Sequence, residues 1–436
     1  MKLSLFQGIL LGVFGLGAII GLIVFATYTS KGGNTGGIGT VVVWGTLPSA
    51  EMQSGLVEIA KSDQSLKGIS YVQKDAATLK DDLASAIATG NAPDLVLATQ
   101  EQIGELAAFT QPIPLSTLSA NAFQGAFVGE DNLFAAPGGG WYALPFLIDP
   151  LVLFSNETIL SSDGIARPPA TWEALAGLVP NVAVLSPTRQ ITRGLIALGT
   201  YDNVHDARGI LSALFLQTGV PISVRSSGGV PTADLGHANT GGNGLPPGQA
   251  VLRFYTQFAD PSKVSYTWNA SLPDSQSAFL SGTLGLYLGY ASEAQFLSAA
   301  NPNLSFNVTP LPQPATATGK STYGLAYAFF IPRGAKNSGG AYQAAVLFSN
   351  TAEQQVFSAA TGLAPAARSA LSSPPASNPA AAVSYASALY AEGWLSPAPA
   401  TTDTIFSGMI TNVITGRSTL QTALSTAEQL LSAQLQ

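Results

Sequence analysis

Between residues 40 and 99 the sequence alternates strand-like and helix-like stretches, and this alternation constrains the fold more than any other feature. Three short runs are typical of buried strands: Thr40–Trp44, Gly68–Val72 and Asp94–Ala98. The two stretches between them repeat apolar residues at helical spacing: Met52, Leu56 and Ile59, and then Leu79, Leu83 and Ile87. This order predicts a doubly wound α/β lobe.

The carboxyl ends of these strands are where an open α/β sheet usually binds its ligand. That rule places Trp44–Thr46 and Thr99–Glu101 on the floor of a cleft. Trp44 could equally be a core aromatic residue. Asp94 opens the third strand, where a carboxylate is more often a cap or a turn residue than a ligand.

From residue 138 onward the pattern changes, and a chain of 436 residues is too long for one ordinary core. A Gly-rich approach followed by Pro145 suits a segment that crosses between two lobes. Beyond it we expect an exposed loop over residues 226–248, strands at 284–290, 306–311 and 327–331, and helices at 172–178, 206–217, 249–258, 275–280, 339–358, 384–395 and 404–431.

The amino-acid composition excludes several classes of partner and of active site. Charged residues make up only 10% of the chain and the net charge is −7, which argues against nucleic acid as a partner. The chain has no cysteine, so disulfides and thiolate sites are excluded. With only two histidines, a zinc site or a His-based triad is hard to build. We therefore expect no metal, no cofactor and no catalytic residues.

The features that could indicate an enzyme are weak. Asp81 and Asp82 are adjacent on a predicted helix, so their side chains point apart and a solvated face is the simpler interpretation. His205 and His237 lack a partner constellation and are expected at the surface. No nucleophile elbow and no phosphate-binding loop motif occurs.

The amino terminus is apolar and carries no charge from residue 3 to residue 30. That length suits a membrane-spanning helix, whereas a secretory signal usually has a shorter core and a small-residue exit. We expect an uncleaved anchor and linker over residues 1–38, with a removed signal as the alternative. The protein would then be a single-pass cell-membrane protein whose folded part is extracellular.

Six motifs, in this order, resemble those of the family 1 extracellular solute-binding proteins: Trp141–Phe146 with Asp149, Arg167–Leu175, Phe279–Leu286, Asn307–Pro312, Ile331–Asn337 and Thr415–Leu424. The resemblance covers nearly all of residues 40–436, although no single motif is decisive. The lipoprotein cysteine of that family is missing here, which leaves the hydrophobic helix as the only anchor.

The resemblance implies a type II periplasmic-binding-protein-like fold with two open α/β lobes behind a transmembrane helix. The first lobe would comprise residues 39–147 and 321–362, and the second residues 148–318 and 365–436. Hinge closure would trap a small polar solute, with a carbohydrate as the leading candidate, for delivery to the permease subunits of an ABC importer. The alternatives are a structural or adhesive surface protein and a secreted glycoside-active enzyme.

Sugar sites in such clefts combine aromatic faces with polar side chains. The candidate ligand-binding residues are Trp44, Trp141, Tyr142, Asp149, Trp268, Tyr290 and Tyr323. Trp268 has a predicted loop position that argues against a core role, and we expect it to face Trp44 across the cleft. Asp149 could instead stabilise the hinge, and Tyr323 could mark a plain turn.

Overall fold

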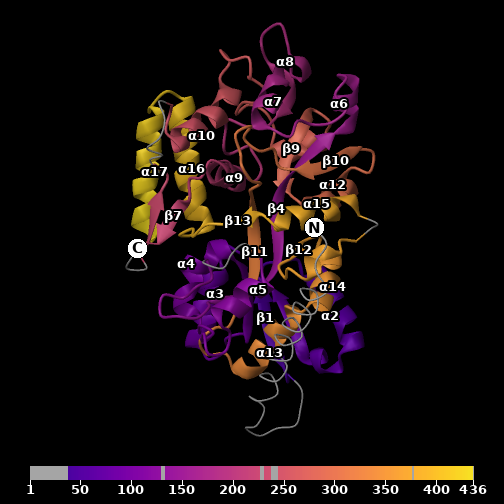
Figure 1. Cartoon of the computed structure of the whole chain (residues 1–436), viewed down its shortest axis with the longest axis vertical. Helices are drawn as coiled ribbons and strands as arrows, with labels where there is room; N and C mark the ends of the chain where they lie inside the picture. Colours follow the sequence, from indigo (N-terminus) through magenta and orange to yellow (C-terminus); the bar gives the residue numbers. More distant parts are fainter. Residues whose placement is uncertain (1–37, 129–132, 226–229, 237–243, 376–377, 436) are drawn as a thin grey trace, which may run out of the picture.

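One mixed sheet runs through the molecule in the order β2-β1-β3-β11-β4-β9-β6-β5 (Figure 1). The computed structural model describes residues 38–128, 133–225, 230–236, 244–375 and 378–435. The sheet serves two α/β lobes, and the long strand β4 (Ala143–Asn156) passes from one lobe into the other. The two-lobed α/β fold expected from the sequence is therefore present.

The first lobe contains the parallel strands β1 (Val41–Gly45), β2 (Ile69–Gln73) and β3 (Leu95–Thr99). Antiparallel to β3 lies β11 (Thr322–Phe330), which also pairs with the first half of β4. The helices of this lobe are α2 (Ser49–Ser62), α3 (Leu79–Ala88), α4 (Ile103–Leu106), α5 (Ala120–Ala126), α13 (Ser338–Phe348) and α14 (Thr351–Thr361). Single 3₁₀ turns lie at Gln64–Gly68, Gln100–Gln102, Ala107–Phe109 and Ala370–Ser372.

The second lobe is built on the other half of β4, which pairs with β9 (Leu284–Tyr290) and β10 (Phe306–Pro310). Strands β6 (Ile191–Ile196) and β5 (Val184–Leu185) extend this side, and β7 (Ile222–Arg225) and β8 (Pro231–Asp234) form a separate hairpin. Its helices are α6 (Glu157–Ser162), α7 (Trp172–Gly177), α8 (Val179–Val182), α9 (Ala207–Gln217), α10 (Pro247–Thr256), α11 (Ser275–Leu280), α12 (Glu293–Ala300), α16 (Pro399–Ile414) and α17 (Leu420–Leu435). A 3₁₀ turn at Gln257–Ala259 follows α10.

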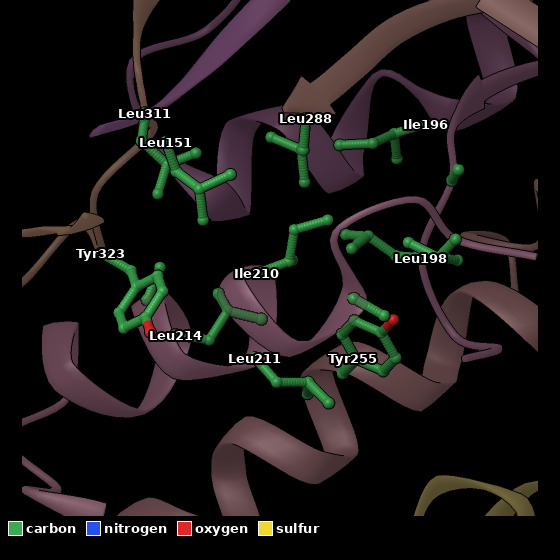
Figure 2. Close-up of a cluster of buried hydrophobic side chains, with 14 of the residues drawn as sticks. Leu151, Ile196, Leu198, Ile210, Leu211, Leu214, Tyr255, Leu288, Leu311 and Tyr323 are labelled. Atoms are coloured by element: carbon green, nitrogen blue, oxygen red, sulfur yellow. The ribbon is translucent and has the colours of Figure 1, made fainter. Parts of the chain in front are cut away.

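Two separate clusters of buried apolar side chains form the cores of the lobes. Phe146, Phe329, Phe348 and Phe357 pack together in the first core. In the second core, Ile210, Leu211 and Leu214 of α9 lie between Tyr323 with Leu151 on one side and Tyr255 with Leu198 on the other (Figure 2). Helix α9 is therefore buried along much of its surface.

The continuous burial of β4 follows from its position in both cores. All of its residues are buried because neighbouring strands cover its edges and its side chains pack into the two cores. Its partner changes at one point: Pro150 pairs with Gly324 of β11, and the next residue, Leu151, pairs with Tyr290 of β9. This change of partner marks the boundary between the lobes.

The described chain between residues 366 and 395 packs on both lobes. All of it was expected in the second lobe, yet Leu371, Tyr385 and Leu395 belong to the first core, whereas Trp394 belongs to the second. The reason is β12 (Ala364–Pro365), which pairs with Leu147 and Ile148 in the first half of β4 and keeps the following chain there. The helix α15 (Pro379–Ala388) and the short strand β13 (Ala391–Glu392) follow.

Three further details differ from the sequence-based expectations. The helix predicted over residues 339–358 is two helices, α13 and α14, separated at Ser349–Asn350. The predicted helix over residues 404–431 is likewise divided, because the chain turns at Gly416 with φ near 70°. Strand β8 falls within the predicted loop over residues 226–248.

Among the described residues, no helix has the length and apolar character needed to span a membrane. The predicted anchor and linker comprise residues 1–38, of which residues 1–37 lie outside the described part of the chain.

Candidate functional site

A cavity of about 380 Å³ lies in the second lobe, at the side that faces the first lobe. Its wall comes from the loop before α9, the first turn of α9, the end of β9 and the start of α16. The lining residues are mostly polar: Tyr201, Asp202, Val204, His205, Asp206, Ala207, Arg208, Gly209, Asp274, Tyr290 and Asp403. A concave site with convergent polar groups is where a small ligand is expected to bind.

The loop before α9 is held in place by hydrogen bonds to the 269–275 segment. The amide of Asn203 donates to the carbonyls of Asn269 and Leu272, each at 3.0 Å. The backbone N–H of His205 donates to Ser275 Oγ at 2.8 Å. The loop begins at Gly199, whose φ of 103° and closeness to Ala259 exclude a side chain. The cavity wall is therefore rigidly positioned.

Arg208 joins this wall to the first lobe. Its Nε and Nη2 donate to the two carboxylate oxygens of Glu101, at 2.8 and 2.9 Å. Glu101 follows β3 of the first lobe and is only 2% exposed. The third guanidinium nitrogen, Nη1, donates to Asp403 of α16. Burial opposes the charge on Arg208, but Glu101 and then Asp403 outweigh it and raise the arginine's pKa.

Two further residues fix Glu101 in this position. The phenol of Tyr323 on β11 donates to Glu101 Oε1 at 2.6 Å. The side-chain amide of the neighbouring Gln100 makes two hydrogen bonds to the backbone of β11. It donates to the Gly324 carbonyl at 2.8 Å and accepts from the Ala326 N–H at 2.7 Å. The end of β3 is thus tied both to the strand that crosses between the lobes and to α9.

Three carboxyl groups lie close together at the cavity: Asp206 lines it, and Asp149 and Glu293 lie behind it. Asp149 of β4 accepts hydrogen bonds from the N–H and hydroxyl of Ser292, and burial raises the pKa of Asp149 to about 7. Glu293 accepts from the Tyr290 N–H at 2.7 Å and from the Tyr287 phenol. Burial, and next the charge of Glu293, raises the pKa of Asp206 well above its usual range.

One group of possible metal ligands occurs among the described residues. The ligand atoms of His205, Asp206 and Glu293 lie within 4.8 Å of one another. Glu293 already accepts three hydrogen bonds, because Gln276 Nε2 donates to it at 2.7 Å in addition to the Tyr290 N–H and the Tyr287 phenol. The guanidinium of Arg208 lines the same cavity and would repel a metal ion. The group therefore fits a metal poorly.

Three of the predicted site residues meet at this boundary. Tyr290 lines the cavity, Tyr323 binds Glu101, and Asp149 lies beside Ser292 where β4 changes partner. Tyr323 is fully buried, so it is not the plain turn residue that the sequence allowed. Tyr290 is the only predicted site residue among those that line the cavity.

Two predicted site residues belong to the first core instead. The ring of Trp141 stacks on Phe123 with ring centroids 3.8 Å apart, and its indole N–H donates to the Leu118 carbonyl at 2.9 Å. Tyr142 packs against the same core. The stack on Phe123 and the bond to Leu118 occupy both the face and the polar edge of Trp141, so neither is open to a solute.

The prediction that Trp268 is an exposed cleft residue is wrong. Its side chain is 1% exposed and belongs to the second core, because the backbone N–H groups of Thr267 and Trp268 bind the Phe258 carbonyl and draw the segment inward. It therefore does not present an open face to Trp44. Trp44 itself is half-buried, and the ammonium of Lys74 lies 4.0 Å from the centre of its ring.

Sequence reasoning missed most of the cavity wall. Tyr201, Asp206, Arg208 and Asp403 were not singled out, and His205 was expected to have no partners. The available signal was a cluster of polar residues just before a strongly apolar helix: Asn203, His205 and Asp206, interrupted only by Val204. His237, the other histidine, lies outside the described residues.

Residues 60–383 match the family described as bacterial extracellular solute-binding protein. No curated protein sequence matches the chain. The match covers most of both lobes. It includes β9, β11 and the loop that precedes α9.

Solved structures show the same fold at low sequence identity. The cyclic alpha-maltosyl-1,6-maltose binding protein of Arthrobacter globiformis has a TM-score of 0.71 and 16% identity, over 91% of this chain and 98% of that one. The sugar-binding protein MalE of Xanthomonas citri has a TM-score of 0.71 and 17% identity, over 91% and 97%. The maltotriose-bound MalE domain of Bdellovibrio bacteriovorus has a TM-score of 0.65 and 17% identity, over 91% and 99%.

Proposed function

Because this chain belongs to the bacterial extracellular solute-binding protein family, whose members are binding proteins and not enzymes, we propose that it captures a carbohydrate for an ABC importer. The observation that carries the proposal is the polar cavity at the lobe boundary, with its tyrosines and carboxylates. Hydroxyl-rich ligands suit such a wall, because each hydroxyl can both donate and accept a hydrogen bond. The sugar-binding names of the structural neighbours support the same ligand class.

The proposed motion is a hinge at the point where β4 changes partner, with β11 as the second crossing strand. The lobes would divide as predicted from the sequence, except that the chain around Leu371 and Tyr385 would belong to the first. Arg208 lines the cavity and also holds Glu101, so a solute that contacts Arg208 would act on the interlobe ion pair. Capture and closure would then be coupled.

The finer assignments are also proposals. Residues 1–28 would hold the receptor at the outer face of the membrane, with the permease subunits of the importer as its protein partners. The length of the uncharged apolar segment supports this. Mass spectrometry of the membrane-bound protein should find residues 1–28 still attached, and a mature protein that begins near Thr29 would contradict the anchor.

A thermal-shift panel tests the carbohydrate assignment. The purified full chain is heated with maltose, maltotriose, cellobiose or mannotriose. A bound sugar at a hundredfold excess over Kd should add about 2.7 kcal/mol to the free energy of unfolding. Tyr201→Phe, which removes a hydroxyl from the cavity wall, should reduce the shift, whereas Tyr266→Phe removes a hydroxyl outside the cavity and should not. A panel without any shift would contradict the assignment.

A further inference from the structure

The motif Asn-x-Ser/Thr, which accepts N-linked glycans in exported proteins, occurs four times in the sequence. The four acceptor asparagines are Asn156, Asn269, Asn303 and Asn307. The chain belongs to a family of extracellular proteins, so these asparagines lie in a part of the chain that is exported. A glycan is bulky and hydrophilic, and a folded protein can carry one only on a side chain that reaches solvent. The surroundings of each asparagine therefore decide which of the four is an acceptor.

Two of the four asparagines are held inside the second lobe. Asn156, the last residue of β4, is 2% exposed, and its Oδ1 accepts a hydrogen bond from the Ile159 N–H at 3.1 Å. Asn269 is half-buried, and its Nδ2 donates to the phenol of Tyr266 at 2.7 Å. A glycan on Asn156 would not fit this fold, and one on Asn269 would displace Tyr266. Neither residue is suited to be an acceptor.

Asn303 lies at the tip of the turn that joins α12 to β10. The Leu304 N–H donates to the Asn301 carbonyl at 3.0 Å and closes this turn, and the Asn303 N–H donates to Asn301 Oδ1 at 3.1 Å. The side chain of Asn303 is exposed, and its carboxamide makes no hydrogen bond with another described residue. Ser305, the hydroxyl residue of the motif, is exposed too. Both side chains that define the motif are thus open to an enzyme.

Asn307 is also exposed, but its backbone is less accessible than that of Asn303. It belongs to β10 and pairs with Ser155 of β4, and its Oδ1 accepts from the N–H of Val308 at 2.8 Å. The tip of a surface turn is more open to a modifying enzyme than a strand that is paired in a sheet. Asn303 is therefore the better acceptor of the two.

The turn at Asn303 is remote from the cavity. Strand β10 runs antiparallel to β4, so that Phe306 pairs with Asn156 and Pro310 with Val152. The turn therefore lies next to the end of β4, six residues beyond Pro150, where β4 changes partner. At a rise of about 3.3 Å per residue this separation is about 20 Å. A glycan at the turn would leave the lobe boundary open to a solute.

We propose that Asn303 carries an N-linked glycan. The donor is an oligosaccharide joined through phosphate to a lipid: Nδ2 of Asn303 bonds to C1 of the first sugar, the bond from C1 to the phosphate oxygen breaks, the amide nitrogen gives up one proton and the lipid phosphate leaves. The glycan adds a hydrophilic surface to a chain in which charged residues make up only 10%. The inference depends on export of the chain and not on which solute the cavity binds.

Mass spectrometry of the full chain, purified from the cells that naturally make it, tests the site. Chymotrypsin cleaves after Phe296 and Phe306, so it separates Asn303 from Asn307. The peptide that contains Asn303 should carry the mass of an oligosaccharide. Asn303→Gln and Ser305→Ala, made in the same cells, should each remove this mass completely. Ser305→Thr keeps the motif and should retain it, and so should the matched control Asn307→Gln.

The variants lie at exposed positions, so folding should survive in each of them. A glycan on Asn303, alone or together with one on Asn307, would support the inference. An unmodified Asn303 would overturn it, whether or not another asparagine is modified. A glycan that persists in Ser305→Ala would also overturn it, because the attachment would not follow the motif. The measurement needs no solute, so its outcome is independent of the carbohydrate assignment.

Discussion

Replacing Glu101 by Gln tests the interlobe ion pair directly. The Glu101 side chain is 3% exposed and that of Arg208 is 20% exposed, so the pair is largely withdrawn from water. Removing one partner of a buried pair typically costs about 3–5 kcal/mol, because the other charge loses its compensation. Asp403 still accepts from Arg208, and Tyr323 can still donate to the new amide oxygen. We therefore expect the low end of this range, about 3 kcal/mol.

Urea denaturation of the full-length variant, followed by tryptophan fluorescence, measures this loss. The matched control is Glu58→Gln, which breaks the pair between Glu58 and Lys61 on the surface of α2. Both side chains of that pair are more than half exposed, and such pairs contribute about 0–1 kcal/mol. Both variants lose one carboxylate, so the difference between their free energies of unfolding measures the effect of burying the ion pair.

A second measurement separates hinge effects from stability. If Glu101 and Arg208 hold the lobes together, the Gln variant should show a larger radius of gyration in solution scattering, whereas the Glu58 variant should match the wild type. A loss of less than 1 kcal/mol with unchanged scattering would refute the reasoning. It would mean that the pair is not a significant contact between the lobes.

Two further predictions concern predicted site residues. Asp149 has a folded pKa of about 7, raised from 3.8, so it binds a proton more tightly in the folded state. Its contribution to stability is complete below about pH 4 and is lost as pH rises towards 7, and Asp149→Asn should remove this fall from a pH series of urea denaturation curves. Trp268→Ala should lower the free energy of unfolding by about 3–5 kcal/mol, since the side chain is a core residue. A Trp268 variant with wild-type stability would show that the tryptophan is not packed.

Much of the scaffold was predictable because its signals are local. The strands β1, β2 and β3 begin within one residue of the predicted runs, and β9 spans the predicted residues. Their apolar patterns depend on burial alone and need no knowledge of partners. The strand-end rule also placed Glu101 at the cleft, where it meets Arg208 of the other lobe.

The candidate site was less predictable because its contacts are distant in sequence. Arg208 lies 107 residues from Glu101 and 195 residues from Asp403, so no local pattern connects them. Trp268, by contrast, was predicted as a site residue but lies in the core. A loop position says nothing about where a side chain points, and the turn at Phe258 directs this one into the core.

The position of β4 also dictates an order of assembly. Each half of β4 needs partners that come much later in the chain, since β9 begins at Leu284 and β11 ends at Phe330. In a nascent chain that emerges from its amino terminus, the second half of β4 therefore lacks its partners until β9 and β10 have emerged, and the first half lacks β11 until Phe330 has emerged. Such long-range pairing slows folding, because loops must close before the contacts can form. The apolar residues of β4 should accordingly stay unpaired, and open to aggregation, while the chain between β4 and β9 emerges.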